Sequence, residues 1–211
     1  CVNNIWISDG SKDNCIDKAE LRGNLKNSLD EIFRTQYSSE RMVDALEPKL
    51  FGIGTESFVV GSLEFYLAYA LLHKKNLCLD MGHFHPTELV SDKISSILTF
   101  ADGLLLHVSR GVRWDSDHVV AYNEELQNVF NEINRMNAYS KVDVALDFFD
   151  ASINRIGAWV IGARNALKAI LVSLLEPVEL LRKAEREGDW AMRLGLLEEC
   201  KSLPFGAVWD R

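Results

Sequence analysis

Short apolar segments alternate with longer helical segments along this chain, and this alternation restricts the possible folds more than any other feature. The apolar segments are rich in Val, Ile, Leu and Phe, and the predicted strands are residues 4–8, 42–46, 77–80, 104–108 and 142–148. Segments that are apolar on both faces are typical of strands buried in a parallel sheet. Repeated strand–helix units therefore predict an α/β fold, either a doubly wound sheet or a (β/α)8 barrel.

The segments between these strands have helical spacing. One of them carries apolar residues at i, i+3, i+4 and i+7, which places their side chains on one helix face: Leu126, Val129, Phe130 and Ile133. The predicted helices are residues 17–33, 56–72, 91–98, 123–136, 152–175 and 178–200, the last interrupted near Gly188. We expect a single domain, in which residues 1–175 form the strand–helix units and residues 176–211 add a C-terminal helical extension.

The composition argues against several classes of protein. The chain has 211 residues, of which 47% are hydrophobic, enough for one sizeable core. Its net charge of −8 argues against a nucleic-acid partner, which would need a basic surface. The four cysteines form no CxxC motif and favour a reducing, cytoplasmic location. No uninterrupted apolar segment is long enough to cross a bilayer, so we expect no membrane partner.

The glycines do not indicate a nucleotide site. No Gly-rich phosphate-binding motif follows the first predicted strand, which disfavours a dinucleotide-binding sheet. The segment Phe51-Gly52-Ile53-Gly54 has two glycines but lacks a third, and we interpret it as a backbone turn. We therefore expect no nucleotide cofactor.

Polar residues stand at or just past the ends of nearly all the predicted strands. In barrels, ligands and catalytic groups project from the C-terminal strand ends. Four of the five histidines also fall between residues 83 and 118, with aspartates among them. Imidazole and carboxylate together suit Mn, Zn, Co or Fe(II). The candidate ligands outnumber the needs of one ion and so predict two divalent ions: Glu47, Asp80, His83, His107, Asp115, Asp117 and Asp147.

Taken singly, most of these residues have a structural alternative. Asp80 could cap a helix, Glu47 could lie on the surface, and His107 could be a hydrogen-bonded core histidine. Asp115 and Asp117 could belong to an exposed acidic loop. Asp147 is the strongest candidate, because a carboxylate within an apolar segment needs a partner.

Other polar residues near these positions receive weaker assignments. Arg110 and Arg113 could bind an anion, but we favour the hypothesis that they neutralise the carboxylates. His73, His85 and His118 receive no role from spacing alone.

Four stretches of the chain resemble L-rhamnose isomerase, and the similarity extends through almost the whole chain. They are EPKLFGIG at 47–54, LDMGHFHPTE at 79–88, LHVSRGVRWDSDH at 106–118 and LDFFDASINR at 146–155. The resemblance implies a (β/α)8 TIM barrel of the xylose-isomerase type and an enzyme that converts L-rhamnose to L-rhamnulose. It also implies a homotetramer for the full-length protein.

The resemblance further implies a division of the candidate ligands between two metal ions, with Mn²⁺ expected and Zn²⁺ or Co²⁺ as alternatives. The first ion would be held by Glu47, Asp80, His107 and Asp147, and the second by His83, Asp115 and Asp117. Two ions could polarise O1 and O2 of the open-chain sugar for a 1,2-hydride shift, while Asp147 orients a water that carries the hydroxyl proton. Lys49 is expected near the substrate. Proton transfer through an enediol intermediate remains a second route for the isomerisation.

The members of this family are about twice as long as this chain, which resembles their later part, about strands 4–8 of the barrel. The start at Cys1 without an initiator Met also suggests a fragment or a processed product. We expect such a half-barrel to associate or aggregate unless the remaining strands are supplied. Two other hypotheses remain: a different metal-dependent sugar isomerase or epimerase, and a scaffold fragment without activity.

Overall fold

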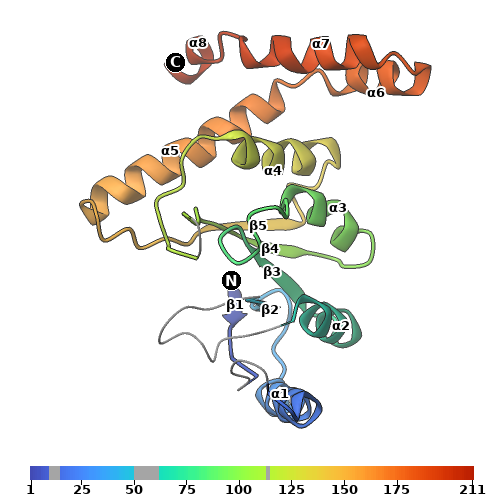
Figure 1. Cartoon of the computed structure of the whole chain (residues 1–211), viewed down its shortest axis with the longest axis vertical. Coiled ribbons are helices and arrows are strands. Elements are labelled where there is room, and N and C mark those ends of the chain that lie inside the picture. The colour runs from blue at the N-terminus through green and yellow to red at the C-terminus, as the bar shows by residue number, and fades with distance from the viewer. Residues whose placement is uncertain (10–14, 50–61, 113–114) are drawn as a thin grey trace.

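Five parallel strands form one continuous sheet in the described part of the chain. The computed structural model describes residues 1–9, 15–49, 62–112 and 115–211. The strands lie side by side in chain order (Figure 1). They are β1 (Val2–Ile5), β2 (Val43–Leu46), β3 (Asn76–Asp80), β4 (Leu104–Val108) and β5 (Val142–Leu146). Sequential parallel order is the arrangement of a barrel wall, and the predicted α/β class is confirmed as a half-barrel.

Helices follow the strands along the chain. They are α1 (Lys18–Ile32), α2 (Leu63–His73), α3 (Ser91–Leu98), α4 (Glu124–Arg135), α5 (Arg155–Leu174), α6 (Val178–Glu187), α7 (Trp190–Lys201) and α8 (Gly206–Trp209). Figure 1 shows α6 and α7 beyond α4 and α5, at the end of the molecule farthest from α1. The first part of the helix predicted at 56–72 and the glycines at 51–54 fall outside the described residues.

The strand residues alternate between two environments. Side chains on one face, such as Leu79 and Leu106, join the main core against the helices. On the other face Ala45, Cys78 and Leu105 form a separate small cluster. Because successive side chains of a strand point to opposite faces, the next residues on this second face are Glu47, Asp80 and His107.

The first strand differs from its predicted position. It covers Val2–Ile5 rather than residues 4–8, and Val2 pairs with Val43. The amide of Asn3 donates to Asp44 Oδ1 at 3.1 Å, and that of Asn4 donates to Glu47. Asparagine has a low strand propensity, so the local pattern predicts a strand that begins after Asn3. The side-chain contacts of Asn3 and Asn4 with β2 explain why the strand begins at Val2 instead.

Helix ends agree with the sequence signals in most places. Asn123 and Asn154 accept hydrogen bonds from the first turns of α4 and α5. Gly188 has a left-handed backbone with φ of 71° and separates α6 from α7, as expected from the predicted interruption. Helix α3 has no side-chain cap; Ser91 is its first residue, and the Ser91 backbone N–H donates to Glu125 Oε1 at 3.1 Å.

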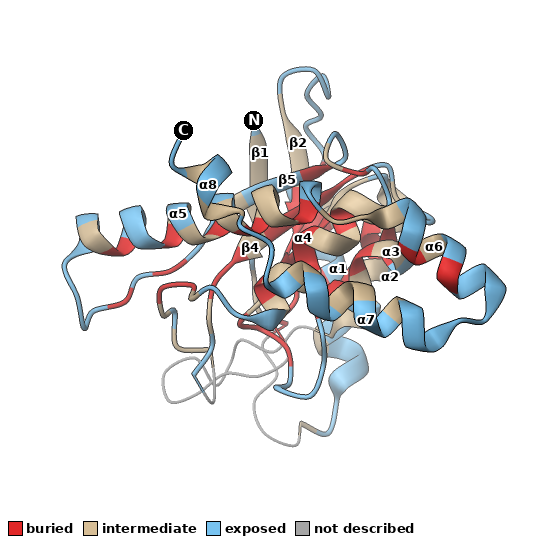
Figure 2. Ribbon diagram, turned by 90° about the horizontal axis from the view of Figure 1, so that it is seen from above, coloured by how far each residue is buried: buried red, intermediate tan, exposed pale blue. Residues whose placement is uncertain are grey.

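Helix α5 is the longest helix and has two different faces. Its buried residues are mostly small, including Ala158 and Ala169, while Trp159 and Leu167 are exposed (Figure 2). By length and composition alone this helix could cross a membrane, and 28% of its most apolar stretch is buried. Such a helix is weak evidence for a membrane span, because core helices also meet this criterion.

Candidate metal centre

Four neighbouring strands each bring one ligand to the same edge of the sheet. Asp80 ends β3 and His107 lies one residue before the end of β4, while Glu47 and Asp147 directly follow β2 and β5. One nitrogen or oxygen atom from each of these four residues lies within 4.8 Å of the others. We call these residues the first metal group. They are the four residues that the family resemblance implies as ligands of the first ion.

The ring nitrogen His107 Nδ1 lies at the centre of this group. It is 2.9 Å from Asp147 Oδ2, 3.3 Å from Glu47 Oε1 and 3.6 Å from Asp80 Oδ2. This nitrogen is buried, and it has no hydrogen-bond partner among the described residues. A divalent cation would satisfy a nitrogen lone pair and three carboxylate oxygens together. The arrangement therefore fits a metal ion.

The electrostatics of the first metal group support the same conclusion. Burial lowers the pKa of His107, but the surrounding acidic side chains, led by Asp147 and Asp80, outweigh burial and raise it strongly. The His107 contact lowers the pKa of Asp147. The group thus has a negative potential that retains positive charge, either a proton on the imidazole or a bound cation.

In two of the carboxylates, one oxygen accepts hydrogen bonds from neighbouring residues and the other oxygen faces the first metal group. Asp80 Oδ1 accepts hydrogen bonds from the Gly82 N–H and from Ser109 Oγ, each at 2.6 Å. Glu47 Oε2 accepts from the Asn4 amide, so Oε1 faces the histidines. Supporting bonds of this kind orient metal ligands. Neither Asn4 nor Ser109 is predicted from the sequence. The alternation of strand faces was the available signal for Asn4, which pairs with Ala45 on the face that carries Glu47.

A second set of residues lies beside the first. Asp80, His83 and Asp115 have ligand atoms within 4.8 Å of one another. His83 Nε2 is 3.3 Å from Asp115 Oδ2, and His83 Nδ1 is 3.2 Å from Glu47 Oε1. Burial opposes protonation of His83, but the acidic neighbours, Asp115 first, raise its pKa to about 9. Asp80 already belongs to the first metal group. We therefore use the name second metal group for the three residues expected to hold the second ion, which are His83, Asp115 and Asp117.

Asp117 differs from the other candidates, because it joins none of the clusters of ligand atoms in the described part of the chain. Like Asp147, it is exposed. Partial burial and the negative charge of Asp115 raise its pKa to about 6. Its backbone is left-handed, with φ of 47°. The structure thus brings two of the three predicted second ligands together and leaves the third at their side.

Lys49 makes a buried ion pair with the second metal group. Its Nζ is 2.7 Å from Asp115 Oδ2, and the two side chains are only 4% and 7% exposed. Burial acts to raise the pKa of Asp115, but His83 and Lys49 outweigh it and lower the pKa to about 2. Lys49 also lies 5.4 Å from the centroid of the Trp6 ring. The exposed-loop alternative for Asp115 is therefore wrong.

Other residues near the site have separate partners. His85 Nδ1 contacts Thr87 Oγ1 at 2.8 Å, and His118 Nδ1 contacts Ser116 Oγ at 2.8 Å. Arg110 Nε donates to the Val119 carbonyl at 2.9 Å and makes no ion pair with the described residues, so it does not neutralise the carboxylates. Arg113 lies outside the described residues.

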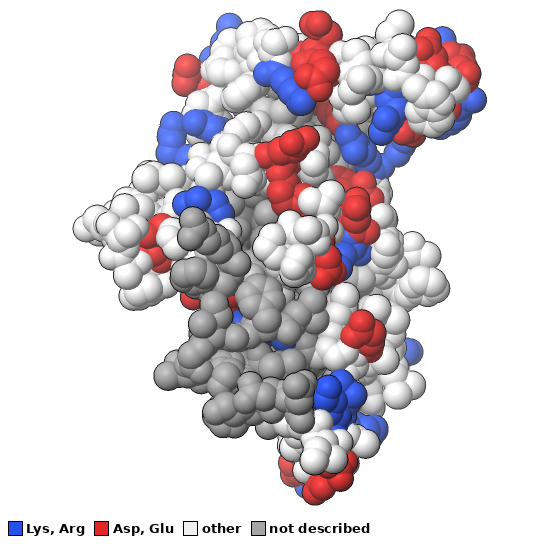
Figure 3. Space-filling model, viewed as in Figure 1, with Lys and Arg blue, Asp and Glu red and all other residues white. Residues whose placement is uncertain are grey.

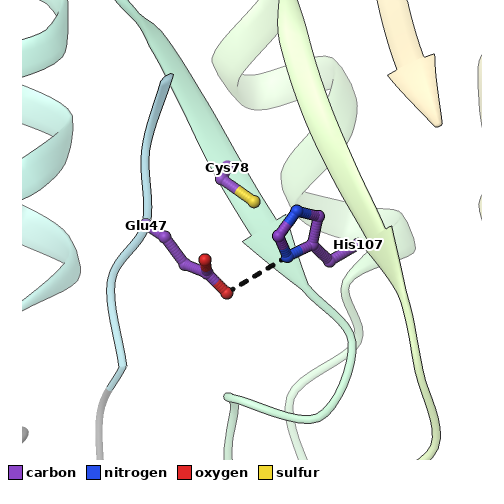
Figure 4. A group of neighbouring side chains, drawn as sticks. All are labelled: Glu47, Cys78 and His107. Carbon is purple, nitrogen blue, oxygen red and sulfur yellow. Dashed lines mark ion pairs between the residues drawn. The ribbon is translucent and has the colours of Figure 1, made fainter. Parts of the chain in front are cut away.

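A cysteine next to the first metal group was also missed. Cys78 Sγ lies within 4.8 Å of ligand atoms of Glu47 and His107, as Figure 4 illustrates. Cys78 belongs to no CxxC pair, so its spacing to other cysteines gave no signal. The position two residues before Asp80 on β3 was the available signal, because it places both side chains on the same face.

The surface does not resemble a nucleic-acid interface on the face seen in Figure 3. Basic and acidic side chains are interspersed there over the C-terminal helices. Near these helices Arg135 Nε pairs with Glu176 Oε2 at 2.8 Å. Paired charges of this kind do not produce the basic patch that phosphate binding requires.

Comparison with known proteins identifies a family for this chain. The family model described as L-rhamnose isomerase (RhaA) matches residues 1–211. An L-rhamnose isomerase of Rhodopirellula baltica is 60% identical over 210 residues, covering 100% of this chain and 49% of the relative. Those of Pectobacterium carotovorum and Yersinia pseudotuberculosis are 58% and 56% identical, each covering 99% of this chain and 50% of the relative. The chain thus spans about half the length of the curated relatives it matches. It belongs to the L-rhamnose isomerase family.

Proposed function

We propose that this chain supplies the metal-binding half of an L-rhamnose isomerase, which interconverts L-rhamnose and L-rhamnulose. The observation that carries the proposal is the convergence of three carboxylates on His107 Nδ1, which has no hydrogen-bond partner in the described part of the chain. A related enzyme with that name and 60% identity supports the choice of sugar. For the whole protein we propose a cytoplasmic homotetramer.

Two divalent ions would occupy the neighbouring groups. Glu47, Asp80, His107 and Asp147 would hold the first, and His83, Asp115 and Asp117 would hold the second. Mn²⁺ suits this set best because five of the seven residues are carboxylates, and Zn²⁺ or Co²⁺ would also fit imidazole and carboxylate. When bound, such ions act as Lewis acids that polarise the sugar oxygens for a 1,2-hydride shift.

The side chains themselves would bind, orient and move protons. Asp147 is 55% exposed and carries a lowered pKa, so it remains ionised and can orient a water that carries the hydroxyl proton between O1 and O2. Lys49, whose Nζ lies 2.7 Å from Asp115 Oδ2, would donate a hydrogen bond to a sugar oxygen. By holding C1 and C2 of the sugar in position, Asp147 and Lys49 would supply part of the rate enhancement.

The proposal is tested first by metal content. Titration with Mn²⁺ should show two bound ions for each chain, and only one after Asp117→Asn. Asp102→Asn, in the exposed segment after α3, is the control and should leave both ions bound. A chain that binds no divalent ion would favour the alternative of an inactive scaffold fragment.

Activity requires the rest of the barrel, so a chimera is the appropriate protein. Residues 1–211 would replace the matching segment of the Rhodopirellula baltica relative, and formation of L-rhamnulose from L-rhamnose would be measured. A panel of other aldoses distinguishes the alternative of another sugar isomerase or an epimerase. Incorporation of solvent hydrogen at C1 of the product would favour an enediol over a hydride shift.

A further inference from the structure

A buried thiol lies next to the first metal group, deeper in the sheet. Cys78 is 0% exposed, and its neighbours on the same sheet face are Ala45 and Leu105. It precedes Asp80 by two residues on β3, so its Cα lies about 6–7 Å further from the strand end. Cys78 therefore lies deeper along the strands than Asp147, which follows the end of β5.

Glu47 and His107 belong to two overlapping sets of ligands. With Asp80 and Asp147 they form the first metal group, and with Cys78 they form a smaller set in which all three ligand atoms lie within 4.8 Å of one another. Figure 4 shows the Cys78 sulfur and the Glu47 carboxylate on the same side of the His107 ring. Both Glu47 and Cys78 are nearly fully buried, at 4% and 0% exposure.

We propose that Glu47, Cys78 and His107 form an alternative, deeper position for one ion, which selects thiophilic divalent cations such as Zn²⁺ and Cd²⁺. In this position a thiolate takes the place of the carboxylates of Asp80 and Asp147. Soft thiolate ligands prefer Zn²⁺ and similar ions, whereas Mn²⁺ prefers oxygen ligands. The choice of ion thus decides at which depth the site is occupied.

The geometry suits such an ion with small side-chain movements. The three ligand atoms lie within 4.8 Å of one another. Zinc binds sulfur at about 2.3 Å and histidine nitrogen or carboxylate oxygen at about 2.0–2.2 Å, so these side chains must move towards one another by about 1 Å to share one ion. On coordination the S–H bond of Cys78 breaks, an S–metal bond forms, and the proton leaves to solvent. No electron transfer is involved.

The inference shares Glu47 and His107 with the proposed isomerase site, but its test measures ligation and does not need turnover. The experiment uses the chain with Cys1, Cys15 and Cys200 changed to Ser, so that Cys78 is the remaining thiol. Zinc X-ray absorption should then show a sulfur scatterer at about 2.3 Å. Titration with Cd²⁺ should show a thiolate-to-metal charge-transfer band in the ultraviolet.

The matched variant is Cys78→Ser, which keeps a small polar side chain at this position. It should lose the sulfur signal and bind Cd²⁺ at least about tenfold more weakly, while Mn²⁺ affinity changes by less than about threefold. Normal Mn²⁺ binding also shows that the variant is folded. The spectra of the protein that retains Cys78 decide the question even if the variant does not fold.

Two outcomes would overturn the inference in different ways. Zinc bound without sulfur, or equal Cd²⁺ affinity in Cys78→Ser, refutes the thiolate position while Mn²⁺ binding leaves the proposed function intact. Failure of every ion to bind would instead remove the proposed metal centre itself, and the inference with it.

Discussion

At the scale of single residues, the candidate site depends on close polar contacts that leave little space. Gly82 shows this most clearly, because a Cβ built there would lie 2.9 Å from Asp115 Oδ1 and 3.0 Å from Ser109 Oγ. Its backbone N–H also donates to Asp80 Oδ1. A glycine here lets the chain pass between two carboxylates that are assigned to different ions.

Gly82→Ala should therefore weaken both the fold and metal binding. The added methyl must displace buried polar atoms, and crowding of this kind costs about 1–3 kcal/mol in the free energy of unfolding. Denaturant unfolding and Mn²⁺ titration would measure the two effects. Gly195→Ala, in α7 with nothing within 4 Å of a built Cβ, is the control and should be neutral or stabilising. Equal effects of both changes would contradict the explanation.

Asp117 should make stability depend on pH in a predictable direction. Its pKa in the fold is about 6, above the ordinary value of 3.8, so its ionised form opposes folding. This cost is complete above pH 6 and absent below pH 3.8. Asp117→Asn should therefore raise the melting temperature of the metal-free protein near neutral pH, with a gain that shrinks as the pH falls from about 6 towards 4.

Melting curves recorded with a chelator at two pH values would test this expectation. Asp102→Asn serves again as the exposed control. A gain for Asp117→Asn that is the same at both pH values would show that the Asp117 charge is not its source. In the presence of Mn²⁺ the melting temperature of Asp117→Asn should no longer exceed that of the unchanged chain, because the variant lacks a carboxylate that helps to hold the second ion.

At the scale of secondary-structure elements, most of the fold follows from hydrophobic periodicity. The strand 104–108 and the helix 91–98 have the bounds that the pattern predicts. Other predicted elements differ at their ends, where local contacts decide. Strand β5 ends at Leu146, and soon afterwards the N–H groups of Phe149 and Asp150 bond to the Asp117 carbonyl at 3.0 and 2.8 Å. No local sequence signal reports such a contact.

The packing of α5 against the end of β5 gives an element-scale prediction. A Cβ built on Gly162 would lie 2.3 Å from the Phe148 ring, which follows β5. Gly162→Ala should push the helix away from the sheet and cost about 1–3 kcal/mol in unfolding free energy. Gly157→Ala on the same helix is the matched control, because its nearest neighbouring atom is 4.0 Å away. Unfolding of both variants in denaturant would compare them, and equal losses would contradict the packing argument.

At the scale of the whole molecule, the described strands form an open arc. Strands β1 and β5 lie at its edges, and Val144 and Leu146 of β5 are 41% and 39% exposed. Unpaired apolar edges promote association. In the family barrel these edges would meet further strands, which fits the observation that this chain covers 49% of a relative of 60% identity.

The isolated chain should therefore associate as its concentration rises. Sedimentation velocity over a range of concentrations would measure this, and Val144→Lys should weaken association by placing a charge at the edge. Leu72→Lys, on the exposed side of α2, is the control and should have little effect. A cooperatively unfolding monomer at all concentrations would contradict the expectation.

The sequence by itself determined the α/β class, most strands and helices, and the carboxylates and histidines at the strand ends. It could do so because burial imposes a period on apolar residues and because parallel strands end at a common edge. Only the tertiary structure decided how these side chains meet: His107 Nδ1 among three carboxylates, Asp115 against Lys49, and Cys78 next to both Glu47 and His107. These contacts depend on distances between strands that are far apart in the chain, and no local pattern contains those distances.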